Sequence, residues 1–113
     1  MADSRIHERL GGGVGDKVIT EDCFRIERDG GYIQKFIDKR SRGYCGFGEV
    51  YFSHLGSFID RGWKYHNVGT SNLTVVVGYI EIVVASGDWT WSEFFDIGPE
   101  RRICIPPGYW YRF

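Results

Sequence analysis

Residues 72–85 read Asn-Leu-Thr-Val-Val-Val-Gly-Tyr-Ile-Glu-Ile-Val-Val-Ala and give the strongest strand signal in the chain. β-Branched residues dominate this stretch, which is typical of strands rather than helices. Gly78 interrupts the run and predicts a hairpin turn or a tight bend. The stretch therefore indicates a protein built on β-strands.

Shorter strands of the same kind are expected on both sides, at residues 18–20, 23–26, 32–37, 48–53, 94–97, 102–105 and 109–111. Glycine-containing turns separate them at roughly ten-residue intervals, and no convincing helical periodicity is visible. This pattern predicts an all-β fold, either a sandwich or a jelly-roll barrel.

The composition is that of one domain of 113 residues with a net charge of −1. Acidic and basic residues are interspersed, so no basic stripe predicts nucleic acid as a partner. No apolar run approaches the ~20 residues of a membrane span, and the N-terminus lacks the apolar core of a signal peptide. We therefore expect a cytoplasmic protein with no membrane partner. The three cysteines have no CxxC spacing, which argues against a disulfide framework or a structural zinc site.

Both ends of the chain differ from this pattern. Residues 1–16 are polar and contain a run of three glycines, which predicts a flexible or strand-exchange arm ahead of a β-domain at 17–113. The chain ends at Phe113, inside an aromatic stretch that we expect to form a buried strand. Because exposed edges invite association, we expect either a truncated chain or a partner covering this end. A loose arm and an unprotected strand together predict a homodimer.

Two short segments combine aromatic and polar residues in an unusual density. They are Arg61-Gly62-Trp63-Lys64-Tyr65-His66 and Ile105-Pro106-Pro107-Gly108-Tyr109-Trp110-Tyr111. In a small β-barrel such segments line the mouth, where aromatic walls and a few polar groups hold a ligand. The alternative for most aromatic residues is plain core filling.

The two segments resemble the signature segments of the cupin superfamily, and more narrowly those of dTDP-4-dehydrorhamnose 3,5-epimerases and related enzymes of nucleotide-linked keto sugars. That family reads arginine-glycine-leucine-histidine-tyrosine-glutamine, with glutamine or glutamate twelve residues before the arginine. Here Glu49 precedes Arg61 by twelve residues, and the glycine-centred strand and the proline-glycine turn follow. The resemblance runs from about residue 46 to Phe113 and implies a cupin-type jelly-roll β-barrel, a homodimer and an isomerase.

The resemblance also implies that neither a metal nor another cofactor is bound. A metal-binding cupin supplies three histidines and a glutamate from these segments. The three histidine positions here are Lys64, His66 and Tyr111, and one imidazole without carboxylates at ligand spacing does not make a first-row metal site.

The same three residues are the expected catalytic groups. Lys64 stands where the family has its catalytic histidine. It is expected to act either as the base, if its pKa is lowered, or as a charged electrophile with His66 as the base. Tyr111 shares a strand face with Tyr109 and is the expected proton-donating phenol. The family's enolate-stabilising lysine falls near Ser71, and its catalytic tyrosine lies beyond Phe113.

The expected substrate-binding residues are Glu49, Tyr51, Arg61, Trp63 and Tyr109. Arg61 or the pair Arg101-Arg102 is expected to hold a diphosphate, Glu49 to orient the acid–base groups, and Trp63 to supply an apolar wall. Structural alternatives are a rim lysine at 64 paired with Glu49, a hydrogen-bonded histidine at 66, and a Glu49 buried beside Arg61 or Lys64.

These observations predict a metal-independent sugar-nucleotide epimerase or isomerase. Its substrate would be an NDP-4-keto-6-deoxy sugar, enolised during surface polysaccharide or deoxysugar biosynthesis. A 3,4-ketoisomerase fits the same chemistry. Two other classes stay open: a non-catalytic carbohydrate or sugar-nucleotide binding cupin module, and an interaction domain that associates by strand addition.

Overall fold

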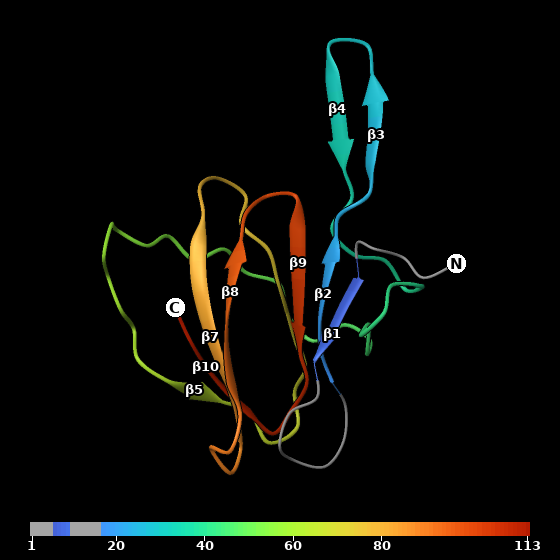
Figure 1. Ribbon diagram of the computed structural model, residues 1–113. Coiled ribbons are helices and arrows are strands. Elements are labelled where there is room, and N and C mark those ends of the chain that lie inside the picture. The colour runs from blue at the N-terminus through green and yellow to red at the C-terminus, as the bar shows by residue number, and fades with distance from the viewer. Residues whose placement is uncertain (1–5, 10–16) are drawn as a thin grey trace.

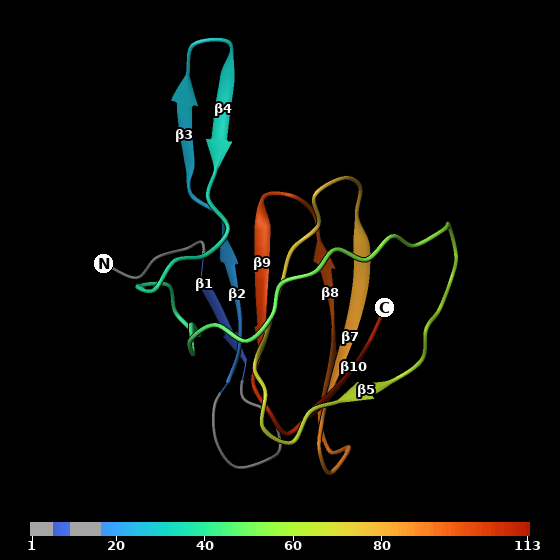
Figure 2. The same cartoon turned by 180° about the vertical axis from the view of Figure 1, so that it is seen from behind.

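The computed structural model describes residues 6–9 and 17–113, and within these ranges the chain forms ten β-strands and no helix. All strand pairs in the described part are antiparallel. The all-β fold expected from the sequence is therefore confirmed. Two four-stranded sheets pack around a shared core, and a separate hairpin projects away from them (Figures 1 and 2).

The first sheet has the order β1-β2-β9-β6, with β1 at Ile6–Arg9, β2 at Val18–Asp22, β9 at Arg101–Ile105 and β6 at Ser71–Leu73. The second has the order β5-β10-β7-β8, with β5 at Lys64–Tyr65, β10 at Tyr109–Arg112, β7 at Ile80–Ser86 and β8 at Ser92–Ile97. The projecting hairpin joins β3 at Arg25–Arg28 to β4 at Gly31–Gln34.

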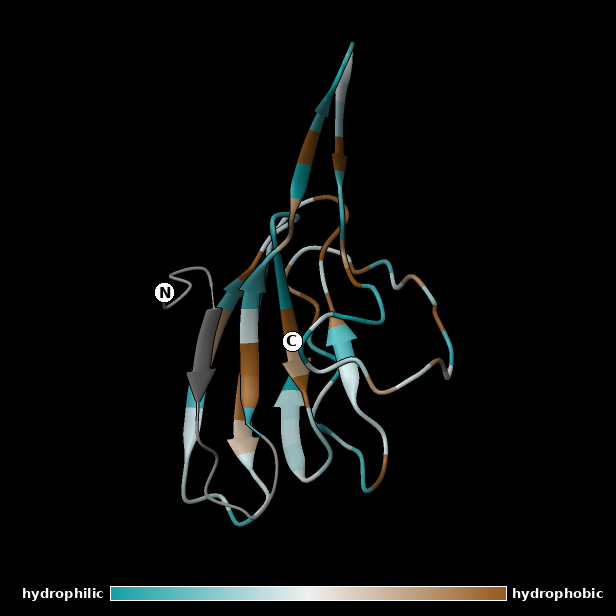
Figure 3. Cartoon of the chain, turned by 90° about the vertical axis from the view of Figure 1, so that its right-hand side faces the viewer, coloured by the Kyte–Doolittle hydropathy of each residue, from teal (hydrophilic) through white to brown (hydrophobic). Residues whose placement is uncertain are grey.

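The hydrophobic core lies between the two four-stranded sheets. Successive side chains of a strand point to opposite faces, so that every second one can point inward. Figure 3 shows the apolar residues as brown bands on the strands. The buried residues of the core are Val18, Ile82, Val84, Phe95, Ile97, Ile103, Ile105, Tyr109 and Tyr111. This arrangement is compatible with a β-sandwich, in which two inner faces pack together.

Strand β9 is buried on both of its faces. Ile103 and Ile105 point into the core, while Arg102 and Cys104 point to the other side and are still only 1% and 2% exposed. The segment around Gly43 covers them, since the Cys104 thiol lies 3.7 Å from the Gly43 carbonyl oxygen and the Asn72 amide donates to that oxygen at 3.2 Å. A strand buried on both faces has no alternating burial pattern, and in β9 all residues from Arg102 to Ile105 are buried.

The prediction of a strand at residues 48–53 is wrong. The structure has no strand there, and Val50, Tyr51 and Phe52 are at least 70% exposed. A strand needs a neighbour to satisfy its backbone and an apolar face to bury, and no strand of the described part pairs with this segment. It belongs instead to the long irregular segment between β4 and β5, which we call the excursion and which returns to the sheet at β5 (Figure 2).

The long stretch 72–85 divides into two strands that belong to different sheets. Strand β6 ends at Leu73 and β7 begins at Ile80, and Gly78 adopts a positive φ of 95° in the turn between them. The bend predicted at this glycine is therefore present. It carries the chain from one sheet to the other.

The expected arm at residues 1–16 is only partly described. Ile6–Arg9 forms the edge strand β1, paired with β2 of the same chain, while 1–5 and 10–16, including the glycine run, lie outside the described residues. Within the described ranges, no helix is both long and apolar enough to cross a membrane.

Candidate functional site

The two segments singled out in the sequence meet in space. Strand β5 pairs with β10, so that Lys64 lies opposite Tyr111 and Tyr65 lies opposite Trp110. The backbone N–H of Gly108 donates to the carbonyl oxygen of His66 at 3.0 Å. Gly108 has a φ of 95°, which favours glycine and closes the turn that begins β10. The proline-glycine turn thus fixes the position of His66.

The three predicted catalytic residues are brought together at this junction. Tyr111 is 3% exposed and points inward, and Lys64 shares its face because directly opposed residues point to the same side of a sheet. The Nε2 atom of His66 lies 3.1 Å from the Tyr111 hydroxyl, a hydrogen bond whose direction depends on the imidazole tautomer. The Lys64 ammonium lies 4.9 Å from the centre of the Phe113 ring. The cluster thus combines an imidazole, a phenol and a primary amine.

Burial controls the protonation of the phenol. Desolvation raises the pKa of Tyr111 above its usual value near 10, and a side-chain hydrogen bond with Ser71 offsets part of this rise. A phenol in this environment is protonated at neutral pH and can donate a hydrogen bond or a proton. His66 is exposed, so the imidazole lies between the buried phenol and solvent.

The predicted substrate-binding residues are divided between several places. Tyr51 is 70% exposed, but lies near enough to Tyr111 to make a small electrostatic contribution to its pKa. Tyr109 is 6% exposed and belongs to the core, where its ring packs edge-on against Trp91 at 6.1 Å. Tyr51 therefore lies close to the cluster, whereas Tyr109 belongs to the hydrophobic core.

The two charged residues expected to bind or orient the substrate are exposed. The Arg61 guanidinium donates to the Ser53 hydroxyl at 3.2 Å and to the His54 carbonyl at 3.0 Å. Both partners are neutral oxygen atoms, and no ion pair of Arg61 is found within residues 6–9 and 17–113. Glu49 is exposed, and the expectation that it is buried beside Arg61 or Lys64 is therefore wrong. Its segment is not a strand and so does not turn this carboxylate toward the core.

Trp63 lies on the opposite face of the second sheet from Tyr111. Its ring packs edge-on against Trp89, with 5.0 Å between ring centres, and the Arg112 guanidinium lies 5.6 Å from its centre. Trp63 therefore does not form the apolar wall that we expected beside Lys64. The turn at Gly62, whose φ is 80°, orients this residue before the strand begins.

Of the pair Arg101-Arg102, Arg102 is not available for a diphosphate. Arg102 is buried, and donates to Glu21 at 2.8 Å and to Asn72 at 2.5 Å. Arg101 donates to the carbonyl oxygen of Asp96 at 3.0 Å. Arg102 is therefore a structural residue between the first sheet and the segment that covers it.

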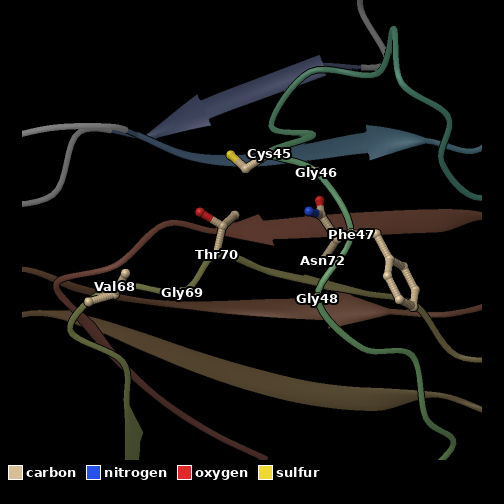
Figure 4. A pocket seen from close by; sticks show the side chains of 8 residues that line it. All are labelled: Cys45, Gly46, Phe47, Gly48, Val68, Gly69, Thr70 and Asn72. Carbon is tan, nitrogen blue, oxygen red and sulfur yellow. The ribbon is translucent and has the colours of Figure 1, made fainter.

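The structure also contains a pocket of about 240 Å³ (Figure 4). It is lined by Cys45, Gly46, Phe47, Gly48, Val68, Gly69, Thr70 and Asn72. None of the three acid–base residues lines it, and the Asn72 side chain already bonds to Arg102 and Gly43. The three acid–base residues lie instead where β5 pairs with β10.

Among the described residues, no three His, Cys, Asp or Glu side chains are grouped so that they could hold a metal ion. Comparison of the chain with protein-family models, with curated proteins and with solved structures finds no match.

Two neighbours of the cluster were not among the predicted site residues. Ser71 pairs with Ile105, a core residue, so strand alternation places its side chain on the inner face near Tyr111. Phe113 stacks on Tyr111 with a ring separation of 6.3 Å. The alternating pattern of residues 109–113 could have identified Phe113, whereas Ser71 requires the pairing of β6 with β9.

Proposed function

We propose that this chain is a metal-independent acid–base enzyme of the cupin type that enolises a nucleotide-linked 4-keto-6-deoxy sugar. The observation that carries the proposal is the 3.1 Å contact between His66 Nε2 and the Tyr111 hydroxyl, with Lys64 directly opposite Tyr111 in the sheet. An imidazole and a protonated phenol in contact, with an amine-bearing residue opposite the phenol in the sheet, form a set suited to moving protons next to a carbonyl.

Each of the three groups has a distinct role in the proposal. The neutral His66 imidazole removes the proton α to the ketone, and the C–H electrons form the carbon–carbon double bond of the enolate. The Lys64 ammonium stabilises the charge that develops on the ketone oxygen. Tyr111 supplies a proton to the intermediate and recovers one through its hydrogen bond with His66. Substrate and product are isomers, so the cycle needs neither an oxidant nor a reductant.

The direct contact between His66 and Tyr111 favours ketoisomerisation over epimerisation. Inversion at a sugar carbon requires that the proton leave one face and return to the other, with the base and the acid on opposite sides. His66 and Tyr111 are hydrogen-bonded to each other and therefore approach a substrate from one side. A proton moved along one face from C3 to C4, together with transfer of the C3 hydroxyl proton to the C4 oxygen in the enediol intermediate, converts the 4-ketone into a 3-ketone. This is a 3,4-ketoisomerase reaction.

The diphosphate of such a substrate would bind to Arg61. Its guanidinium is exposed, and its contacts with Ser53 and His54 are made to neutral oxygen atoms. A planar guanidinium with remaining donors is suited to a phosphate. Tyr51, on the same excursion of the chain, can close over a sugar bound at Tyr111.

The proposal is tested by proton exchange. dTDP-4-keto-6-deoxyglucose is incubated with the protein in D₂O and followed by NMR, for wild type and for His66→Asn, Tyr111→Phe and Lys64→Met. We expect deuterium at C3, a slowly appearing 3-keto product, and a loss of about 10² or more in exchange rate for His66→Asn. Phe94→Ala, on the other face of the sheet, is the matched control and should leave exchange unchanged.

The possible outcomes separate the candidate functions. Deuterium at both C3 and C5 with inverted products would replace ketoisomerisation by 3,5-epimerisation. Saturable binding of the nucleotide sugar without exchange would identify a non-catalytic binding module. If neither exchange nor binding occurs, the assignment to keto sugars is refuted.

A further inference from the structure

The outer face of the second sheet carries a cluster of aromatic rings that the interior site does not use. It consists of Trp63, Tyr65, Trp89 and Trp110, and we call it the aromatic platform. Trp110 stacks on Trp89 with 5.4 Å between ring centres and an interplanar angle of 25°. Tyr65 lies 4.8 Å from Trp110, and Trp63 meets Trp89 edge-on at 5.0 Å.

The rings of the platform remain open to solvent although they contact each other. Trp63, Tyr65 and Trp89 are 36%, 40% and 53% exposed. Tryptophan is usually well buried in a folded chain, so a group of exposed indoles on one face is informative. The contacts within the cluster therefore leave part of the surface of these three residues accessible.

The turn between β7 and β8 directs Trp89 outward. Its backbone is strained at Trp89, and hydrogen bonds within the turn hold it in place. Trp89 has a φ of 62°, which is uncommon for a residue other than glycine. Its backbone N–H donates to the Ser86 carbonyl oxygen at 2.9 Å, and an Asp88 carboxylate oxygen accepts from the Thr90 N–H at 3.1 Å. Backbone strain of this kind persists where the surrounding bonds determine it, and it is concentrated at functional sites.

A neutral ion pair forms the rim of the platform next to Trp63. Arg112 donates from Nε to a carboxylate oxygen of Asp60 at 2.7 Å and also contacts it through Nη2. The second carboxylate oxygen accepts the Gly62 N–H at 2.7 Å, which fixes the turn that presents Trp63. The pair lies at the surface and keeps unused donors on the guanidinium and lone pairs on the carboxylate.

We propose that the aromatic platform binds the sugar rings of a neutral glycan. A pyranose has an apolar face of C–H groups that packs on an aromatic ring, and equatorial hydroxyls that need both donors and acceptors. The exposed indoles supply the first surface, and the Asp60–Arg112 pair supplies both kinds of hydrogen-bonding group. Because the pair compensates its own charge, the rim attracts neither anions nor cations. This site is separate from the interior cluster, since Trp110 and Tyr111 are successive residues of β10 and point to opposite faces.

The test is a titration of the full chain with neutral oligosaccharides, namely cellohexaose, laminarihexaose, xylohexaose and mannohexaose. Isothermal calorimetry measures affinity, and ¹⁵N-correlated NMR follows the indole N–H signals. We expect at least one probe to bind with a Kd of about 1 mM or tighter and to shift the indole signals of the platform. Trp89→Ala should weaken that binding by about threefold to tenfold, and Arg112→Leu should weaken it as well.

Phe94→Ala is the matched control. Phe94 is 66% exposed on the same face of the same sheet, on strand β8 and outside the platform, so its removal should leave binding unchanged within about twofold. Lys64→Met, an interior substitution, should also leave it unchanged. Dispersed NMR spectra of each variant confirm that the fold is retained.

Three results overturn the proposal. The first is the absence of binding and of indole shifts for all four probes up to about 10 mM. The second is binding that Trp89→Ala and Phe94→Ala affect equally. The third is a dimer in sedimentation experiments that Trp89→Ala dissociates, because the occupant of the platform would then be a second copy of the chain.

Discussion

Removing the carboxylate of Glu21 should destabilise the fold more than removing the arginine that it binds. The guanidinium of Arg102 is 1% exposed and is held by Glu21 at 2.8 Å and by Asn72, while its Nε atom has no hydrogen-bond partner among the described residues. The Glu21 side chain is 24% exposed, so water still reaches the carboxylate. Glu21→Gln therefore leaves a buried cation without its counter-charge, whereas Arg102→Met leaves a carboxylate that water can solvate.

The magnitude follows from this difference in burial. Breaking a fully buried pair costs about 3–5 kcal/mol, and the partial exposure of Glu21 reduces this to about 2 kcal/mol for Glu21→Gln. Arg102→Met should cost about 1 kcal/mol or less, because the apolar side chain fills the space between the first sheet and its covering segment. A change of 1 kcal/mol moves Tm by about 4 °C in a domain of this size, so the two variants should differ by about 4 °C or more.

The assay is urea unfolding at neutral pH, with thermal unfolding as a second measure. Glu27→Gln is the matched control, since Glu27 pairs with Arg25 at 2.9 Å but both side chains are more than half exposed. A surface pair of this kind contributes little, so the control should lose less than about 0.5 kcal/mol. The reasoning is refuted if Arg102→Met is more damaging than Glu21→Gln, because the buried guanidinium would then be a net source of stability.

Three further changes probe the packing and the interior cluster. Gly43→Ala should destabilise the fold by about 2–3 kcal/mol in urea unfolding, because the added Cβ would lie 2.3 Å from the Cys104 sulfur and because Gly43 has a φ of 82°. Gly31→Ala is the control and should be near neutral, because a Cβ at Gly31 meets no atom within 4 Å. Thr20→Val should raise stability by about 1 kcal/mol, because the fully buried Thr20 hydroxyl has no partner among the described residues; a loss of stability would indicate that it does. Since burial raises the pKa of Tyr111, its contribution to stability is complete below the unfolded pKa near 10 and is lost as pH rises through the higher folded pKa. Wild type should therefore lose more stability than Tyr111→Phe above about pH 10, and parallel pH profiles of the two proteins would contradict this.

The sequence predicts those parts of the fold that depend on local pattern. The β-branched run of β7 and the alternating aromatic residues of β10 form strands because each has a face to bury and a neighbour to pair with. Residues 48–53 have the same apolar character but no partner strand in the described part of the chain. Whether a segment becomes a strand depends on what lies beside it, and the residues of the segment alone do not encode this.

The candidate site shows the same limit at the level of single residues. His66, Lys64 and Tyr111 could be grouped in advance because the two segments that carry them resemble the paired signature segments of cupins. The direction of Trp63 depends on the bend at Gly62 just before β5, and a change of one residue in parity moves a side chain to the other face. The burial of Arg102 depends on a covering segment about sixty positions away in the chain. Contacts of this range cannot be read from local sequence.

The packing of the indoles in the aromatic platform has an optical consequence. The chain has four tryptophans, and three of them stand in one group, while Trp91 packs separately against Tyr109. Transition dipoles of neighbouring indoles that are close and skewed couple to each other, and the coupling produces a paired positive and negative band in circular dichroism. Trp89 and Trp110 meet at 25°, and Trp63 and Trp89 at 87°. The circular dichroism of the protein should therefore contain a band pair that arises from the aromatic platform and reports the geometry of that surface without a label.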